Sequence, residues 1–283
     1  DNNKPKSLID ASIRCLAEDK TGKIWVGTFR GGLHSFLPAT GTFDYHNASQ
    51  SGFENASEKS DKIRTLYLDK EGMFWVGTFN GGTFLFDPDK KEYIKSFFSE
   101  EVEGAISHNW VLSFAEDVNG LIWIATNDSG LCFYNRTTGK FSRQYSDEYN
   151  PLGLSSNSLR SLLCDESGNM WVGTTTNGVN VFFRNTLKFT HYRRKVGSEN
   201  TLLHNIIYCI YKGQSNNIWF CSKGGELSCL DRSTGKYSHY KDVCSATNKT
   251  ILTIHEDKSG MFYLGSYGGG ISVFDQATGR SAL

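Results

Sequence analysis

One motif returns along this chain, and its spacing limits what the chain can fold into. In the first copy Asp19 is followed by Gly22 and then by an aromatic anchor, Trp25. The anchors of the six copies are Trp25, Trp75, Trp123, Trp171, Trp219 and Tyr263. The steps between these anchors are 50, 48, 48, 48 and 44 residues. A period of roughly 40–50 residues with strand-like content is typical of a β-propeller, which places one four-stranded blade in each repeat.

We therefore expect an all-β fold, a single β-propeller of four-stranded blades over residues 1–283. Six blades are recognisable, at residues 8–58, 59–106, 107–154, 155–201, 202–247 and 248–283. Residues 1–8 read like the internal connector 147–154, and residues 280–283 stop short of an expected outer strand. The chain thus looks cut from a longer array, for which we expect a parent ring of seven blades. A ring of six blades stays open as the alternative.

Each repeat can be resolved into four strands, which in the first copy we expect at residues 12–17, 24–28, 33–36 and 42–45. The first two are joined by a turn in which the Asp side chain accepts backbone N–H bonds and the Gly supplies a positive φ. The fifth copy has Gly213 and Asn216 at these two places. Because Asn tolerates the left-handed conformation, we expect that turn to survive. Each anchor should fill the gap between neighbouring blades.

Composition excludes several classes of function. Thirty basic residues balance thirty acidic ones, so no broad charge favours nucleic acid. No apolar run approaches the ~20 residues that span a bilayer. The seven cysteines include no C-x-x-C pair, and we interpret them as small buried thiols. A bridge between Cys221 and Cys229 across one hairpin is the alternative.

The loops that follow the anchors are the predicted ligand site, because pockets open where loops converge. Equivalent loop positions face similar structural demands, yet they carry different side chains from repeat to repeat. Trp110 is the Trp outside the repeat, at the entrance of the first strand of the third blade. Aromatic faces can stack on sugar rings, and polar groups can bond hydroxyl or acidic groups. The predicted ligand-binding residues are Phe29, Arg30, Trp110, Asn127, Asp128, Lys223 and Tyr267. Packing for Trp110 and ordinary solvation for the others are the alternatives.

Signals for catalysis are weak. The sequence has no nucleophile elbow, metal cluster or phosphate loop, so we predict no catalytic residue, no metal and no cofactor. Arg14, Arg64 and Arg160 take one repeat position in three blades. We interpret these arginines as buried structural partners for backbone carbonyls or carboxylates.

The pattern Asp-x-x-Gly-x-Ile-Trp-Val-Gly-Thr-x-x-Gly-Gly-Leu around Trp25, followed by Thr-Gly-x-Phe, resembles the two-component regulator propeller repeat. The resemblance covers essentially the whole chain. It implies the periplasmic sensor region of hybrid two-component systems in Bacteroidetes, where propellers precede an immunoglobulin-like domain, a membrane helix, a histidine kinase and a DNA-binding response regulator. Such sensors detect oligosaccharides. The kinase parts are not in this sequence, so the fragment itself is expected not to be an enzyme.

Three functions compete at this stage. The first is a sensor module that binds an oligosaccharide and relays the signal by domain or subunit rearrangement, with an adjacent propeller and a homodimer partner and no contact to nucleic acid. Membrane attachment would come only through the missing part of the parent protein. The second is a propeller glycosidase or polysaccharide lyase, which would need two carboxylates ~5–10 Å apart over a pocket. The third is a ring used purely for protein interaction.

Overall fold

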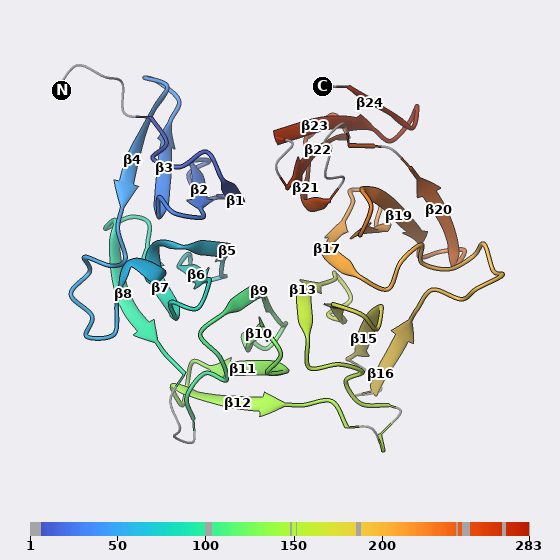
Figure 1. Cartoon of the computed structure of the whole chain (residues 1–283), viewed down its shortest axis with the longest axis horizontal. Coiled ribbons are helices and arrows are strands. Elements are labelled where there is room, and N and C mark those ends of the chain that lie inside the picture. The colour runs from blue at the N-terminus through green and yellow to red at the C-terminus, as the bar shows by residue number, and fades with distance from the viewer. Residues whose placement is uncertain are drawn as a thin grey trace. The chain divides into compact units, whose positions relative to one another are not determined.

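The computed structural model describes residues 7–99, 104–147, 149–150, 152–184, 188–241, 243–244, 250–267 and 270–282. These residues form two compact units, Asp1–Gln144 and Tyr145–Leu283. Each unit contains three four-stranded sheets, and in every sheet consecutive strands pair in sequence order (Figure 1). The units are described separately below.

The first unit holds the first three blades, drawn from blue to green in Figure 1. Their sheets are β1-β2-β3-β4, β5-β6-β7-β8 and β9-β10-β11-β12. The strands are β1 (Ile13–Glu18), β2 (Ile24–Thr28), β3 (Leu33–Leu37), β4 (Thr42–His46), β5 (Ile63–Leu68), β6 (Phe74–Thr78), β7 (Thr83–Asp87), β8 (Glu92–Phe97), β9 (Val111–Glu116), β10 (Ile122–Thr126), β11 (Leu131–Asn135) and β12 (Lys140–Gln144). A 3-10 turn, η1 (Glu58–Asp61), precedes β5.

The second unit repeats this plan with sheets β13-β14-β15-β16, β17-β18-β19-β20 and β21-β22-β23-β24. The strands are β13 (Leu159–Cys164), β14 (Met170–Thr174), β15 (Val179–Phe183), β16 (Lys188–Tyr192), β17 (Ile207–Lys212), β18 (Ile218–Ser222), β19 (Glu226–Asp231), β20 (Lys236–Tyr240), β21 (Ile251–Glu256), β22 (Met261–Ser266), β23 (Gly270–Asp275) and β24 (Arg280–Ala282). The all-β propeller prediction is confirmed, and η1 is the one helical element among the described residues.

The antiparallel order gives every blade two distinct ends. The turns from first to second strand and from third to fourth strand lie at one end, here called the turn end. The loops from second to third strand, and the connectors that enter each first strand, lie at the opposite end, here called the loop end. Because the strands are short and regular, residues at equivalent repeat positions stand at the same end of every blade.

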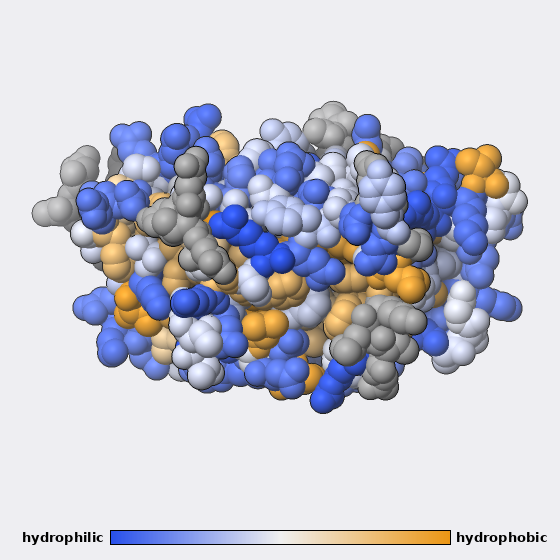
Figure 2. All heavy atoms as spheres, turned by 90° about the horizontal axis from the view of Figure 1, so that it is seen from below, coloured by the Kyte–Doolittle hydropathy of each residue, from blue (hydrophilic) through white to orange (hydrophobic). Residues whose placement is uncertain are grey.

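Four of the anchor tryptophans pack between neighbouring blades, as predicted, and Trp123 packs on Phe133 of its own blade at 4.7 Å. Trp25 lies 5.5 Å from Phe74 and 5.1 Å from Phe86 of the next blade, measured between ring centroids. Trp219 contacts Phe262 of the following blade at 4.8 Å. All five tryptophans are at most 6% exposed. Tilted and edge-to-face burial of large rings therefore contributes to the apolar core between sheets. Figure 2 shows hydrophilic residues along the margins of one face and hydrophobic residues mainly across its middle.

Tyr263 departs from this prediction. Its side chain is 40% exposed, although it holds the anchor position of the sixth repeat. The four tryptophans that pack between blades each contact a ring of the blade that follows, whereas Tyr263 donates its hydroxyl to Asp257 of its own repeat at 3.3 Å. The period therefore gave the right position for Tyr263 but not its burial.

The cysteines are all free thiols. Cys221 lies opposite Cys209 on β17 and opposite Leu227 on β19, whereas Cys229 lies opposite Trp219. The register thus separates the two cysteines that the alternative paired, and the bridge between Cys221 and Cys229 is not formed. Burial raises the pKa of the Cys229 thiol to about 11, which keeps the sulfur protonated at neutral pH.

Candidate functional site

At the turn end, one carboxylate organises each turn and also holds the anchor. Asp19 accepts hydrogen bonds from the backbone N–H groups of Thr21 and Lys23 and, at 2.8 Å, from Trp25 Nε1. The same indole bond reappears at Asp69, Asp117 and Asp165, at 2.9, 3.2 and 3.0 Å. Partial burial alone would raise the pKa of Asp19, but the bonds from Thr21 and Trp25 lower it overall. The repeated Asp is therefore a structural acceptor.

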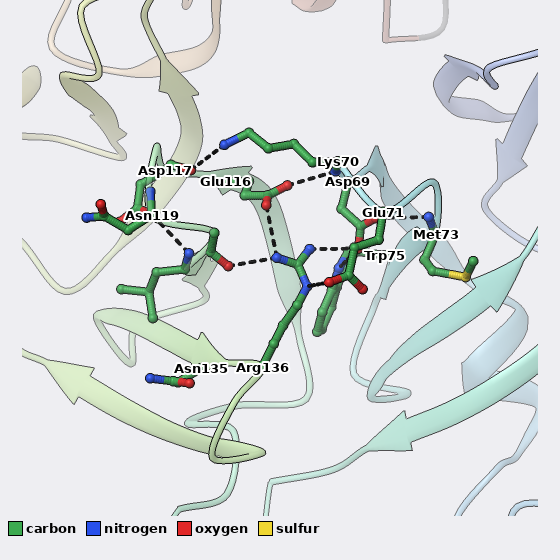
Figure 3. A network of polar contacts seen from close by, with 12 residues as sticks. Asp69, Lys70, Glu71, Met73, Trp75, Glu116, Asp117, Asn119, Asn135 and Arg136 are labelled. Carbon is green, nitrogen blue, oxygen red and sulfur yellow. Dashed lines mark hydrogen bonds and ion pairs between the residues drawn. The ribbon is translucent and has the colours of Figure 1, made fainter.

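Between the second and third blades this turn end carries an ion network (Figure 3). Arg136 donates to the Asp69 carboxylate and to the Glu116 carboxylate, both at 2.9 Å, and to the Gly120 carbonyl. Glu116 also accepts the backbone N–H of Lys70. The two carboxylates are nearly fully buried and Arg136 is 20% exposed. One guanidinium thus pairs with two buried carboxylates and joins adjacent blades.

A hollow of about 400 Å³ lies beside this network and includes Glu71, Asp117, Asn135 and Arg136 in its lining. Its polar groups already serve the turns: Asp117 accepts backbone bonds from Asn119 and Leu121, and Asn135 accepts one from Thr137. The described residues contain no group of three or more His, Cys, Asp or Glu side chains placed to hold a metal ion. We therefore place the candidate site at the other end of the blades.

At the loop end, the backbone repeats with great regularity. The Thr at the end of the motif closes each tight loop: Thr78 Oγ1 donates to the Gly82 carbonyl at 2.6 Å and accepts from Gly81 N at 2.9 Å. Thr28, Thr126 and Thr174 make the corresponding bond to Gly32, Gly130 and Gly178. This hydroxyl explains why the motif ends in Thr.

The residue after this position is fixed in the same way in all six blades. Its N–H donates to the carbonyl of the residue that immediately precedes the first strand, as Phe79 does to Lys62 at 2.8 Å and Asn127 does to Trp110 at 3.1 Å. The six residues held by this bond are Phe29, Phe79, Asn127, Thr175, Lys223 and Tyr267. Identical backbone bonding therefore presents six positions with four chemical types of side chain.

In the first unit, two of these six positions and Trp110 form one aromatic cluster. The ring centroids of Phe29 and Phe79 lie 4.9 Å apart, edge to face, and those of Phe79 and Trp110 lie 5.4 Å apart. Trp110 is half-buried, and its Nε1–H has no acceptor among the described residues. Phe29 and Phe79 are also half-buried, so part of each ring faces solvent. We call Phe29, Phe79 and Trp110 the aromatic cluster.

Arginines stand over these rings. Arg14 Cζ lies 4.8 Å from the Phe29 centroid and 5.6 Å from the Phe79 centroid. Arg64 Cζ lies 6.0 Å from Phe79, and Arg30 Cζ lies 5.9 Å from Phe29. These distances suit cation–π attraction. Arg14 and Arg64 were interpreted as buried partners, but both are half-buried and stand at the aromatic cluster.

Two predicted residues at the third blade have a backbone explanation. Asp128 has a φ of 56°, and Asn80 at the same repeat position has 63°. Asp and Asn tolerate the left-handed region better than most residues, so the fold does favour particular residues here, contrary to the sequence argument. Asn127 donates its side-chain amide to Asp128 at 2.9 Å. Both residues lie at the loop end, but the positive φ at position 128 at least partly explains why an Asp stands there.

Lys223 and Tyr267 belong to the second unit and are exposed. They share the backbone bond described above, so the period placed them correctly at the loop end. Phe79, Arg14 and Arg64 were missed as candidate residues. Phe79 could have been found, because it is one period from Phe29. The stacking of the arginines depends on three-dimensional contacts between β1 and β5 that spacing alone does not give.

The comparisons with known proteins agree with the repeat. The family model of the two-component regulator propeller matches residues 7–30, 57–80, 105–128 and 153–176. Each match runs from the connector through the anchor to the loop end. The fifth and sixth copies, which are not matched, carry Gly213 in place of Asp and Tyr263 in place of Trp. A comparison with curated protein sequences gave no match.

Solved structures show the same fold. The extracellular domain of BT3049, assigned to the hybrid two-component systems of B. thetaiotaomicron, superposes with a TM-score of 0.74 and 23% identity, over 96% of this chain and 34% of that one. Virginiamycin B lyase from Staphylococcus aureus gives a TM-score of 0.67 and 14% identity, over 96% and 83%. PorZ of Porphyromonas gingivalis gives 0.65 and 16%, over 92% and 38%.

This chain spans about a third of the length of the BT3049 domain. Among the described residues no helix is long and apolar enough to cross a membrane. At these identities the solved structures support the fold alone. The family model finds four copies of the two-component regulator propeller repeat, all within residues 7–176 of the chain.

Proposed function

We propose that this chain is the ligand-binding part of a two-component sensor and that it binds an oligosaccharide at the loop end of its first three blades. The observation that carries the proposal is the aromatic cluster. The backbone bond that fixes Phe29 and Phe79 is shared by all six blades, so the fold does not require aromatic side chains there. Half-exposed rings at such a position suit stacking on the apolar face of a sugar.

The repeat family supports a sensor context, and the likeness to an extracellular domain of BT3049 suits a periplasmic location. Propeller blades are stiff, closely packed sheets, so a bound sugar would act by changing how this chain meets a neighbouring propeller or a second subunit. Such a sensor module has no catalytic step of its own. The fold is shared with a lyase, so product formation must be tested directly.

The test is calorimetric titration of the chain with a panel of neutral and acidic oligosaccharides. Phe79→Ala and Trp110→Ala should each weaken binding of the best ligand at least about tenfold, the effect of losing one to two kcal/mol of stacking. Tyr149→Ala is the matched control, because Tyr149 is an aromatic residue that is 93% exposed and is not one of the three rings of the aromatic cluster.

Unchanged affinity in both cluster variants, with folding intact by circular dichroism, would exclude this end of the first unit as the site. Chromatography of the ligand after incubation settles the enzymatic alternative. A cleaved or rearranged sugar would contradict a pure binding module.

A further inference from the structure

Each blade brings one residue of its first strand directly opposite one residue of its second strand, near the loop end. In the fifth blade this pair is Cys209 and Cys221. In the other five blades the second-strand residue is Gly or Ala. Two thiols thus replace a pair in which one partner otherwise carries at most a methyl group. The other pairs are Cys15 with Gly27, Thr65 with Gly77, Ser113 with Ala125, Ser161 with Gly173 and Thr253 with Gly265.

Side chains at this pair of positions point at each other. A Cβ built on Gly77 would lie 2.7 Å from Cγ2 of Thr65, and one built on Gly265 would lie 2.7 Å from Cγ2 of Thr253. Residues directly opposite in an antiparallel pair have Cα atoms about 4.5–5.5 Å apart, within the range of about 4.4–6.8 Å that a disulfide spans. The register of β17 and β18 therefore suits a bridge between the two sulfurs of the fifth blade.

The two thiols also interact with each other. Cys221 is fully buried in a core that includes Ile251 and Phe262 of the sixth blade, and the half-buried Cys209 packs against this core. Burial raises the pKa of the Cys221 thiol well above its usual range, and a hydrogen bond with Cys209 raises it further. The hydrogen bond agrees with the contact that the register requires.

The other thiols near this core are less well placed to bridge Cys221. Cys229 lies two residues along β19 from Leu227, the residue directly opposite Cys221. Such diagonal neighbours are about 7–8 Å apart, which is beyond the reach of a bridge. Cys244, in the connector that follows β20, accepts a hydrogen bond from Ser272 Oγ at 3.9 Å. The register therefore favours the pair across β17 and β18.

We infer that Cys209 and Cys221 are a modification site, at which a disulfide forms across β17 and β18 by exchange with a small disulfide of the class of oxidised glutathione. Cys209 reacts first because it is half-buried, whereas Cys221 is fully buried. This inference goes beyond the proposed function and does not depend on it.

The exchange takes two steps that balance. The Cys209 thiolate attacks one sulfur of the donor disulfide, which forms a mixed disulfide and releases one donor thiolate. The sulfur of Cys221 then attacks the sulfur of Cys209, gives up its proton and displaces the second donor thiolate. The donor thiolates take up the two protons, so one donor disulfide becomes two thiols while two thiols of the chain become one disulfide.

The experiment uses the whole folded chain, reduced and then freed of reductant. The chain is incubated with oxidised glutathione, alkylated in denaturant and digested with trypsin. Cleavage after Lys212 places Cys209 and Cys221 on different peptides. We expect these two peptides to be recovered as one linked species, while Cys229 and Cys244 are recovered as alkylated thiols. An excess of reduced glutathione should reverse the link.

One variant tests the order of the two steps. Cys221→Ala copies the third blade, where Ala125 takes this position, and removes the sulfur that closes the bridge. The mass of this variant should therefore increase by one glutathione, attached to Cys209. Cys229→Ala is the matched control, because Cys229 is a buried thiol of the same blade, and it should leave the link unchanged.

Three results with the folded wild-type chain would overturn the inference. They are recovery of Cys209 and Cys221 as alkylated thiols, a stable glutathione adduct on Cys209 without the link, and a link from either cysteine to Cys229. None of these results would bear on the proposed function, which fails only if Phe79→Ala and Trp110→Ala leave sugar binding unchanged.

Discussion

At the turn end of the blades the bond between Asp and the anchor recurs from copy to copy, whereas at the loop end a Thr hydroxyl bond recurs but the residue after that Thr keeps only its backbone bond. An Asp oxygen accepts a hydrogen bond from the anchor indole in four repeats. In the sixth repeat the Asp oxygen accepts from the hydroxyl of Tyr263 instead. At the loop end, one N–H bond is made in all six blades while the side chains beside it change. Repetition of side chains thus marks what the fold needs, and repetition of backbone without side chains marks a surface free to specialise.

The largest difference between the two ends should appear when one ring is removed from each. Trp75→Ala should lower the free energy of unfolding by about 3–5 kcal/mol, because the ring is 1% exposed and packs on Phe114 and Tyr134 of the next blade. Trp110→Ala should cost much less, since that ring is half-buried. Urea unfolding followed by circular dichroism measures both. Equal losses of unfolding free energy in the two variants would contradict the proposed difference between the two ends.

The ion network at the turn end gives the next largest effect. Asp69→Asn keeps one oxygen but loses the charge that pairs with Arg136, so the free energy of unfolding should fall by about 2–3 kcal/mol. Asp128→Asn, at the exposed loop end, should change stability by less than about 0.5 kcal/mol. If Asp69→Asn were as mild as its control, the network would not stabilise the fold.

Low pH should destabilise the fold by protonating a carboxylate at the turn end. The hydroxyls of Ser233 and Thr234 hold the pKa of Asp231 at about 2, below its usual value of 3.8. A folded-state pKa that is depressed adds stability above pH 3.8 and loses it as the pH falls toward 2. Ser233→Ala should therefore move this loss to higher pH, as read from unfolding curves collected between pH 5 and 2. An unchanged acid profile would show that these hydroxyls do not act on Asp231.

The smallest effect should come from repairing the repeat that lacks its Asp. Trp219 Nε1 has no acceptor among the described residues, and a Cβ at Gly213 would lie 3.0 Å from it. Gly213→Asn should supply an acceptor and raise stability by about 0.5–1 kcal/mol. Gly213→Asp should gain less, because Glu256 lies close by and Gln276 stands where Arg136 stands in the third blade. A destabilised Gly213→Asn variant would show that the site is too tight.

Much of the fold could be predicted from the sequence because the anchor spacing is so regular. Strand positions, the Asp-based turns and the burial of the five tryptophans all follow from one period and from turn chemistry. The exposure of Tyr263 could not be predicted, because burial depends on which blade lies against an anchor. The absence of the Asp–indole bond at Trp219 could have been predicted, because position 213 is Gly where the other repeats have Asp.

The candidate site was less predictable. The period correctly brought Phe29 and Lys223 to equivalent loop positions. It could not show that Arg14 stacks on rings from two different blades, because the contact with Phe79 joins positions 65 residues apart through the packing of β1 on β5. The anchor spacing also did not reveal the positive φ of Asp128, because spacing carries no information on backbone conformation.

Hydrogen exchange on the chain, with and without a saturating concentration of the oligosaccharide that binds best in the titration panel, tests the difference between the two ends most directly. The amides of Phe79 and Asn127 report on the loop end, and those of Asn119 and Leu121 report on the turn end of the same unit. The account predicts that a bound sugar slows exchange in the peptides that contain Phe79 and Trp110 and leaves residues 117–121 unchanged. Protection at residues 117–121, with none around Phe79 and Trp110, would contradict it.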